Sequence, residues 1–580
     1  MVEPGVVNMR LQQELDKFGF FYAPDPSSQK VSTIGGNIGE NAGGPQCLKY
    51  GVTSDNVEKL EVVTPEGEVK LWDYRDPGPD LMSLMVGSEG TLGVVTRAWL
   101  KILEKPKFIR TAVASFPSIE NAIDAVTRII GAGIVPRALE AMDKVSLNAA
   151  MRGAAGSGKK STAQYPPGTE AILLIELDGT NDRKISAELR EITGLCNASF
   201  ASAVTTAADP AERDALWQAR KGSYPAMARL APNVMVEDGA VPRPLLPAAL
   251  KETREIISKY KLNAGLLFHA GDGNLHPNII FDERDIQEVK RVKKAGYEML
   301  RSCIRLGGSI SGEHGIGVEK RVAMNWMYDA PILDFFGAIK TAFDPKNLAN
   351  PDKILPVAED RKASAPSLRH VPPGEAASAI LNELKLRLTK GEKSAVAGQG
   401  TRGRGAPKSG SSLYKTLDTT PLNKILELDR ENFTVRAEAG VPVKELRKWL
   451  KKAGFTVALP DTEGTLGGLI AAKAWPAARD ILLGMDVALA DGTALSFGGK
   501  TVKNVAGYDV MKLFCGSLGA YGVILTLTLR TAFHSPQEKG EDAPKTSGQQ
   551  IFTPDEYHRR LKKAFDPQNL LNPWVYGETL

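Results

Sequence analysis

Cysteine is scarce in this chain of 580 residues. Only four occur, Cys47, Cys196, Cys303 and Cys515, and no two of them form a Cys-x-x-Cys pair. This spacing argues against a disulfide framework, a zinc ribbon and a cysteine-ligated iron–sulfur cluster, because each of these needs paired or clustered thiols. The cysteine usage fits a reducing compartment, and we therefore expect a cytoplasmic protein.

Long apolar runs and a strong net charge are missing as well. No stretch approaches the ~18 to 20 apolar residues that span a bilayer, and Met1 is followed by Glu3 and Pro4 instead of a basic segment and an apolar core. The 73 Lys and Arg nearly balance the 68 Asp and Glu. This composition predicts a soluble, unexported protein with no nucleic-acid partner.

Glycine, in contrast, is abundant, and its clusters mark an internal repeat. The 56 Gly exceed the usual ~7% of a chain. The segment 34–38 (IGGNI) recurs at 466–470 (LGGLI), and 87–94 (GSEGTLGV) recurs at 516–523 (GSLGAYGV). Between these two segments each copy has a predicted hairpin turn, at Glu66-Gly67 in the first copy and at Asp491-Gly492 in the second. Each copy ends with a third repeated segment, FDPKNL at 343–348 and FDPQNL at 565–570.

The two copies are incomplete in different ways. The second copy has a Gly-rich loop at 398–405 (GQGTRGRG), whereas the matching position of the first copy falls before Met1, so the first copy has lost this loop or begins late. The first copy instead carries a long insert before its FDP echo. We predict a truncated first module at 1–105, a substrate domain at 106–356, a linker at 357–374, a second module at 375–534, a linker at 535–550 and a helical tail at 551–580.

Two of the glycine-rich segments suggest ligand binding. Loop 398–405, with Arg402 and Arg404 inside it, can point several backbone N–H groups at one anion, which makes it a candidate diphosphate cradle or else a flexible turn. Segment 32–50 has five Gly and two Asn. It is either a loop packed against a flat ring or the N-terminus of a helix buried against a sheet.

These motifs carry a resemblance to a known family. Segments 35–51, 87–94 and above all 498–509 (GGKTVKNVAGYD) resemble FAD-binding domains of the vanillyl-alcohol-oxidase and para-cresol-methylhydroxylase type. Residues 1–356 resemble the catalytic FAD-linked subunit of bacterial glycolate oxidase, and residues 375–575 resemble its companion FAD-binding subunit. The resemblance implies a fusion with an α+β fold, in which a ferredoxin-like α+β substrate domain lies between two FAD-binding modules, the first of them truncated.

The same resemblance implies FAD as the cofactor. In the family an FAD domain has two lobes, and the lobe with the diphosphate loop is absent from the first module, which leaves open whether that module binds FAD alone. The implied FAD-binding residues are Gly35, Gly36, Asn37, Asn41, Gly43, Gly44, Gly51, Glu89, Gly90, Thr91, Gly93 and Val94 in the first module, and Gly398, Gly400, Thr401, Gly403, Gly405, Gly464, Thr465, Gly467, Gly468, Asn504, Gly507 and Asp509 in the second.

Three of the six histidines fall in two tight motifs. In LLFHAGDGNLHPNII (266–280) a two-residue turn at Asp272-Gly273 would place His269 directly opposite His276, so that both could hold one divalent metal. In SISGEHGIG (309–317) Glu313 and His314 could add a ligand and a base. Each histidine alone is more often a core or surface residue, and the metal site is favoured because three of the six fall in two such motifs. His370, His534 and His558 are expected to be solvated.

The resemblance assigns roles to this constellation. It implies that His269, His276 and Glu313 bind a divalent metal (zinc, manganese or iron) and that His314 is the catalytic base. Arg220 matches the family's partner for the substrate carboxylate, although a helix-surface arginine is an equal reading. Asn278 and Lys320 are further substrate candidates.

We therefore expect FAD-dependent oxidation of a small D-2-hydroxy acid, glycolate first and D-lactate second. Electrons would pass to a separate iron–sulfur subunit, because the chain has no cysteine cluster of its own. That partner could also hold the protein at the inner face of the membrane. Two alternatives remain: a non-catalytic assembly or electron-relay subunit, and a second module whose diphosphate lobe reaches across to the first.

Overall fold

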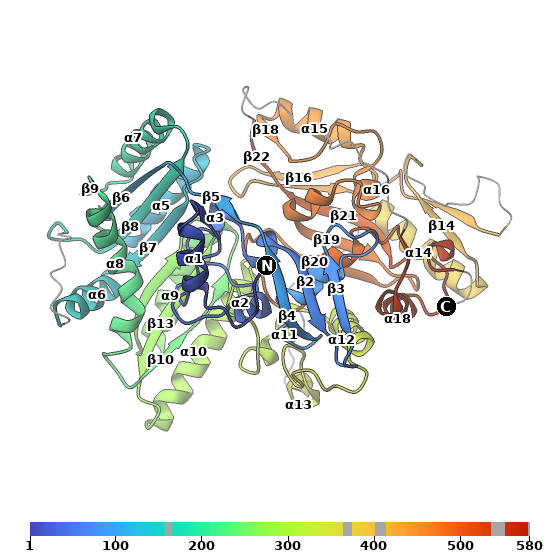
Figure 1. Cartoon of the computed structure of the whole chain (residues 1–580), viewed down its shortest axis with the longest axis horizontal. Coiled ribbons are helices and arrows are strands. Elements are labelled where there is room, and N and C mark those ends of the chain that lie inside the picture. The colour runs from blue at the N-terminus through green and yellow to red at the C-terminus, as the bar shows by residue number, and fades with distance from the viewer. Residues whose placement is uncertain (157–164, 363–373, 401–412, 535–551, 578–580) are drawn as a thin grey trace.

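The computed structural model describes residues 1–156, 165–362, 374–400, 413–534 and 552–577. It has an α+β architecture in which three parts lie side by side (Figure 1). In this view the first module, in blue, lies between the substrate domain on the left and the second module, in orange, on the right. The predicted fold class is confirmed.

One large antiparallel sheet forms the substrate domain. Its strand order is β10-β13-β12-β7-β8-β6-β9, with β11 paired to β13. In its first half the fourth strand, β9, lies beside the first, β6, and the third, β8, separates β6 from β7, which is the ferredoxin-like order. The strands are β6 (Phe108–Phe116), β7 (Ala138–Asp143), β8 (Ala171–Gly179), β9 (Ala203–Thr206), β10 (Asn233–Val236), β11 (Gly239–Ala240), β12 (Asn263–His269) and β13 (Asn274–Phe281).

Helices cover both faces of this sheet, which is why most residues of β8 are buried. The helices of one layer are amphipathic. In α5, for example, Ser118 caps the first turn, and Ile123, Val126 and Ile130 face the core. That layer consists of α5 (Ile119–Gly131), α7 (Asp182–Ala198), α9 (Leu246–Lys259) and α10 (Ile286–Arg305). On the other face lie α6 (Lys144–Gly156) and α8 (Pro210–Met227).

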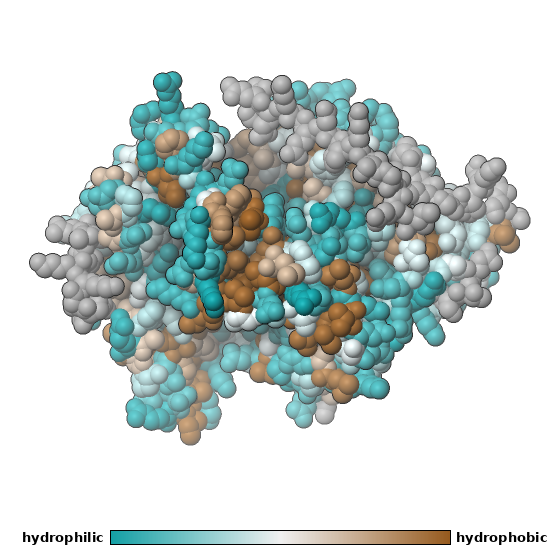
Figure 2. Space-filling model, in the orientation of Figure 1, coloured by the Kyte–Doolittle hydropathy of each residue, from teal (hydrophilic) through white to brown (hydrophobic). Residues whose placement is uncertain are grey.

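The first module has a three-stranded sheet in the order β3-β2-β4. Its strands are β2 (Val57–Val63), β3 (Val69–Asp73) and β4 (Val94–Leu100), and β1 (Phe20–Phe21) pairs separately with β5 (Leu103–Glu104). Its helices are α1 (Asn8–Asp16), α2 (Ile34–Glu40), α3 (Cys47–Tyr50) and α4 (Leu81–Met85). Val69, Leu71 and Val94 of this sheet are more than half exposed. Figure 2 shows hydrophobic residues, in brown, gathered at the centre of this face of the molecule.

The predicted open loop at 32–50 is wrong for its first half. Ile34–Glu40 is helix α2, and the Thr33 side chain caps it by accepting a hydrogen bond from the Gly36 amide. The alternative reading, a helix N-terminus, is the one that the structure adopts.

The second module has a larger sheet than the first. Five strands follow the order β16-β17-β21-β19-β20, and the pairs β14-β15 and β18-β22 lie apart from them. The strands are β14 (Ser394–Ala397), β15 (Lys415–Asp418), β16 (Ile425–Asp429), β17 (Thr434–Glu438), β18 (Phe455–Thr456), β19 (Leu482–Ala488), β20 (Ala494–Gly498), β21 (Val523–Arg530) and β22 (Ala532–Phe533). Its helices are α14 (Glu375–Lys390), α15 (Val443–Lys452), α16 (Leu466–Ala471) and α17 (Met511–Phe514).

The repeat is confirmed by the backbone. Glu89 and Leu518, which match in the alignment of the two copies, both adopt the left-handed conformation, with φ of 51° and 52°. The start of α2 is tied by a hydrogen bond from the Ile34 amide to the Val6 carbonyl, and the start of α16 is tied in the same way by Leu466 and Val441. Both predicted hairpins also form, as β2–β3 and β19–β20.

The FDP echoes end two matching helices, α12 (Ala330–Phe343) and α18 (Glu556–Phe565), that pack against each other. Phe335 stacks on Phe565 at 4.2 Å and Phe343 stacks on Tyr557 at 5.0 Å between ring centroids. Because matching positions exchange partners across the contact, the two helices are related by a local two-fold axis.

The predicted linker at 357–374 begins with a short helix, α13 (Ala358–Lys362), whose Asp360 carboxylate binds Arg321, 2.6 Å away, and its role as a linker stays a prediction. The expectation that His558 is solvated is wrong. His558 is only 8% exposed and its Nδ1 lies 2.7 Å from Asp555, because it lies on the packed face of α18. His370 lies outside the described residues. In the described part of the chain no helix is long and apolar enough to cross a membrane.

Candidate active site

The two motif histidines lie together, but not in the predicted register. His269 pairs with Asn274 across the β12–β13 hairpin, and His276 pairs with Leu267. The turn therefore has four residues, 270–273, instead of the two expected at Asp272-Gly273. The histidines are diagonal neighbours on one face of the sheet, and their ring centroids lie 5.1 Å apart.

Both imidazoles converge on one carboxylate oxygen. His269 Nε2 lies 3.1 Å and His276 Nε2 lies 3.4 Å from Glu313 Oε1. A metal with bonds of ~2.0 to 2.1 Å in a tetrahedron separates its ligands by roughly 3.3 to 3.4 Å. The three predicted ligands therefore fit one divalent metal.

A buried carboxylate fixes the orientation of His269. Glu140 Oε1, on β7, lies 2.7 Å from His269 Nδ1, so that Nε2 is turned toward Glu313. Although burial opposes both charges, this pairing raises the pKa of His269 to about 9, and His269 with Arg220 lowers the pKa of Glu140 to about 2. Metal-binding histidines commonly have such an outer carboxylate.

Arg220 is buried, and its guanidinium binds the Glu140 carboxylate instead of facing an open pocket. Its Nε and Nη2 lie 2.8 Å and 2.7 Å from Glu140 Oε2. The guanidinium therefore orients the carboxylate that orients His269. Its predicted contact with a substrate carboxylate stays a prediction.

A second buried carboxylate, Asp238, anchors the loop that carries Glu313 and His314. It accepts hydrogen bonds from the Ser311 hydroxyl and from the amides of Gly312, Glu313 and His314, at 2.7 to 3.3 Å. Although burial opposes it, the electrostatic influence of His314, Lys320 and His276 lowers the pKa of Asp238 far below its usual range. The anchored loop holds His314 exposed and stacked on His276, with ring centroids 5.0 Å apart.

The other two substrate candidates lie at the rim of this cluster. Asn278 is buried two residues after His276, and its amide donates to the His276 carbonyl at 2.8 Å. Lys320 Nζ lies 3.5 Å from Asp238 Oδ2. The contact of either side chain with a substrate stays a prediction.

A carboxylate of the first module, Glu89, holds the end of the same loop. Glu89 accepts hydrogen bonds from the amides of Ile316 and Gly317, at 2.6 and 2.8 Å. Glu40 lies beside Glu89, and burial together with that like charge raises the pKa of Glu40 to about 8.

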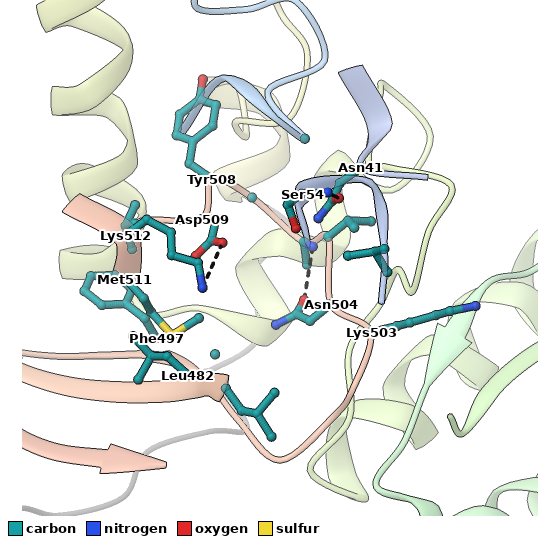
Figure 3. A pocket seen from close by; sticks show the side chains of 18 of the residues that line it. Asn41, Ser54, Leu482, Phe497, Lys503, Asn504, Tyr508, Asp509, Met511 and Lys512 are labelled. Atoms are coloured by element: carbon teal, nitrogen blue, oxygen red, sulfur yellow. Dashed lines mark hydrogen bonds and ion pairs between the residues drawn. The ribbon is translucent and has the colours of Figure 1, made fainter. Parts of the chain in front are cut away.

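The second module adds a cation to the cluster. Lys503 Nζ lies 2.9 Å from Glu313 Oε2 and 3.1 Å from Asp272 Oδ2. Figure 3 shows its side chain pointing away from the neighbouring cavity, toward the strands of the substrate domain. The site is thus built from all three parts of the chain.

That cavity, of about 100 Å³, lies where the two modules meet (Figure 3). Four predicted FAD-binding residues line it: Asn41, Asn504, Gly507 and Asp509. Three of its lining residues each have a buried polar atom without a hydrogen-bond partner: Asp509 Oδ1, Thr501 Oγ1 and Arg530 Nε. Its residues fit a polar part of FAD, but whole-ligand pockets measure ~300 to 1,000 Å³, so this cavity is too small for the whole cofactor.

The remaining predicted FAD-binding residues lie in other places. Around α16, Gly398 lies against Thr465, and Gly464, Gly467 and Gly468 are next to it. In the first module Gly43 lies against Glu313 and Lys503, where we expected a flat ring. Thr401, Gly403 and Gly405 lie outside the described residues. For the other predicted residues of the first module, contact with FAD stays a prediction; they are Gly35, Gly36, Asn37, Gly44, Gly51, Gly90, Gly93 and Val94.

Glu140, Asp238, Asp272 and Lys503 were missed as site residues. Asp272 lies inside the histidine motif and Lys503 inside the most specific resemblance, so both had a local signal. Glu140 and Asp238 had none, because only the sheet pairing brings β7 next to β12 and the loop after β10 next to residues 311–314.

Two family models match the chain in both of its halves. A family model of the C-terminal domain of FAD-linked oxidases matches residues 105–354 and 554–575, and an FAD binding domain model matches residues 1–71 and 377–498. The glycolate oxidase subunit GlcD of Escherichia coli (strain K12) is 43% identical over 358 residues, which cover 61% of this chain and 70% of that protein.

Two further relatives agree in extent. The glycolate oxidase subunit GlcD of Bacillus subtilis (strain 168) is 40% identical over 61% of this chain and 74% of its own length. The D-lactate dehydrogenase of Anaerostipes hadrus is 32% identical over 61% of this chain and 75% of its own length.

Proposed function

The chain belongs to the FAD-linked oxidases, and from this membership we propose that it is an FAD-dependent 2-hydroxy-acid dehydrogenase. Its substrate is a small D-2-hydroxy acid, glycolate or D-lactate, and the product is the 2-oxo acid. The relatives named above support this substrate class.

The observation that carries the proposal is the convergence of His269, His276 and Glu313 beside an exposed histidine. Oxidation of a 2-hydroxy acid removes a proton from the hydroxyl and a hydride from Cα. A group that takes the proton must lie within hydrogen-bond reach of the hydroxyl. His314, stacked on His276 at the edge of the cluster, is accessible for that task.

The chain's own residues would then have the following roles. His269, His276 and Glu313 hold a divalent metal, which when bound lowers the pKa of a substrate hydroxyl. FAD, when bound, supplies the hydride acceptor. His314 takes the hydroxyl proton, while Asp238 keeps its loop in place and Glu140 keeps Nε2 of His269 directed into the site.

Reduction of an artificial dye tests this proposal. The purified chain, supplied with FAD and Mn²⁺, should reduce the dye with glycolate or D-lactate. His314→Gln should slow the reaction by about 100-fold or more, as expected for loss of a general base, whereas His534→Gln, remote in sequence and outside the cluster, should not. A reconstituted preparation that is inert to every 2-hydroxy acid would rule out the enzyme.

We also propose that the chain is a fusion of two subunits of one complex. The repeated module and the two-fold contact of α12 with α18 support this idea, since such a contact is typical of two homologous subunits. Electrons would leave to a separate iron–sulfur subunit, because the four cysteines are buried and far apart in sequence. We place the protein in the cytoplasm, at the membrane's inner face through that partner.

One observation favours a second candidate, a non-catalytic electron-relay subunit. Lys503 lies against the same carboxylate that the metal would need. A relay subunit would still bind FAD and accept electrons from a partner, but glycolate would not reduce its flavin. Dye reduction by the isolated chain therefore separates the two candidates.

A further inference from the structure

A lysine of the second module is fully buried in the site of the substrate domain. The Lys503 side chain has no exposed surface, and its ammonium contacts Glu313 and Asp272 at 2.9 and 3.1 Å. Burial of an ammonium is costly unless anions surround it. These contacts therefore pair one cation with two carboxylates in a region closed to solvent.

The position of Lys503 is fixed by the chain that follows it. The Asn504 side chain accepts a hydrogen bond from the Ser309 hydroxyl at 2.7 Å, and the Val505 amide donates to the Ser311 carbonyl at 3.1 Å. The Ala506 carbonyl then accepts from the Tyr328 hydroxyl at 2.8 Å. Segment 503–506 thus lies along the loop that presents Glu313 and His314.

Glu313 is shared between this ammonium and the histidines. Its Oε1 faces both Nε2 atoms, and its Oε2 faces Lys503. Gly43 of the first module leaves the room, because a Cβ there would lie 2.7 Å from Glu313 Oε2 and 3.1 Å from Lys503 Cε. A metal and Lys503 would therefore neutralise the same carboxylate.

We propose that Lys503 is a tethered cation that weakens divalent-metal binding at His269, His276 and Glu313 when the second module is docked. This inference rests on the metal site of the proposed function. Like charges a few ångströms apart repel strongly in a buried site, so the ammonium lowers the gain from adding a dication. The second module would in this way control how readily the catalytic site is loaded.

A competing explanation makes the opposite prediction. If Lys503 only positions Glu313, its removal would leave the carboxylate misdirected and metal binding would weaken. The sign of the change in affinity therefore decides between a competing cation and a positioning residue.

The test is a calorimetric titration of the full-length chain with Mn²⁺ and, separately, with Zn²⁺. Lys503→Met removes the charge, Lys503→Gln removes it but keeps an N–H donor for the two carboxylates, and Lys503→Arg retains it. Lys512→Met is the matched control for metal binding, because Lys512 is another buried lysine of the second module and contacts the Arg479 carbonyl instead of Glu313 and Asp272. Melting curves with and without metal report on folding.

The uncharged variants should bind metal at least about 10-fold more tightly than wild type, and His269→Ala should abolish that gain. Lys503→Arg and Lys512→Met should bind like wild type. Equal or weaker binding by a folded Lys503→Gln would overturn the inference, and so would a failure of all forms to bind. Dye reduction by glycolate in the same preparations tests the proposed enzyme separately, because a competing cation is not needed for it.

Discussion

Glutamine in place of Glu140 removes one negative charge from the centre of the substrate domain. Glu140 is 1% exposed and bonds to Arg220 and His269. The substitution leaves the Arg220 guanidinium buried without its anion and leaves His269 without the partner that orients its ring. Both stability and metal binding should therefore suffer.

The size of both effects follows from these contacts. Breaking one side of a buried ion pair costs about 3 to 5 kcal/mol. In a domain of this size each kcal/mol lowers the melting temperature by roughly 2 to 4 °C, so the substrate domain should melt about 6 to 20 °C lower. Loss of an outer carboxylate should weaken metal binding by about 10- to 100-fold.

Glu176→Gln is the matched control. Glu176 is 2% exposed in the same sheet, and Arg213 Nε lies 2.8 Å from its carboxylate, but it contacts no histidine. Calorimetric melting should show a loss for both variants, whereas metal titration and dye reduction should show a loss for Glu140→Gln alone. The reasoning is refuted if Glu140→Gln keeps wild-type metal affinity, or if Glu176→Gln loses as much.

Three further changes test other parts of the structure. The pKa of Glu40 is raised to about 8, so the contribution of its protonated form to stability is lost as pH rises from about 4.5 to 8. Glu40→Gln should therefore melt at a higher temperature than wild type near pH 9 but not near pH 5. Equal melting curves at both pH values would contradict this. Asp238→Asn should lower kcat for dye reduction about 10- to 100-fold, since four hydrogen bonds to one carboxylate weaken; an unchanged kcat refutes its anchoring role. Tyr508→Phe removes the 2.8 Å hydroxyl contact with Thr91 between the modules and should cost about 1 to 3 kcal/mol; unaltered melting would show that the modules unfold independently.

Local signals predicted the modules and much of the site. The matching glycine segments gave the repeat, because residues such as Glu89 and Leu518 lie in turns that short motifs determine. The two histidines of the hairpin motif were placed on one face correctly. Their register was wrong, because a four-residue turn preserves the face while it shifts the partners.

Contacts between segments that are distant in the chain could not be predicted from the sequence. Lys503 and Glu313 are far apart in the chain, and only the docking of the second module joins them. Arg220 was singled out, but its partner Glu140 lies on another strand with no motif around it. The burial of His558 was predictable, since Tyr557, Leu561 and Phe565 give α18 an apolar face.

The most direct test of the proposed dehydrogenase is reduction of its own bound flavin. The FAD-loaded, metal-loaded chain is mixed with glycolate or D-lactate without oxygen or dye, and the visible absorbance of oxidised flavin is followed. The account predicts that the absorbance bleaches within the turnover time and that His314→Gln bleaches about 100-fold more slowly. A flavin that stays oxidised with every 2-hydroxy acid, yet is reduced by dithionite, would contradict it.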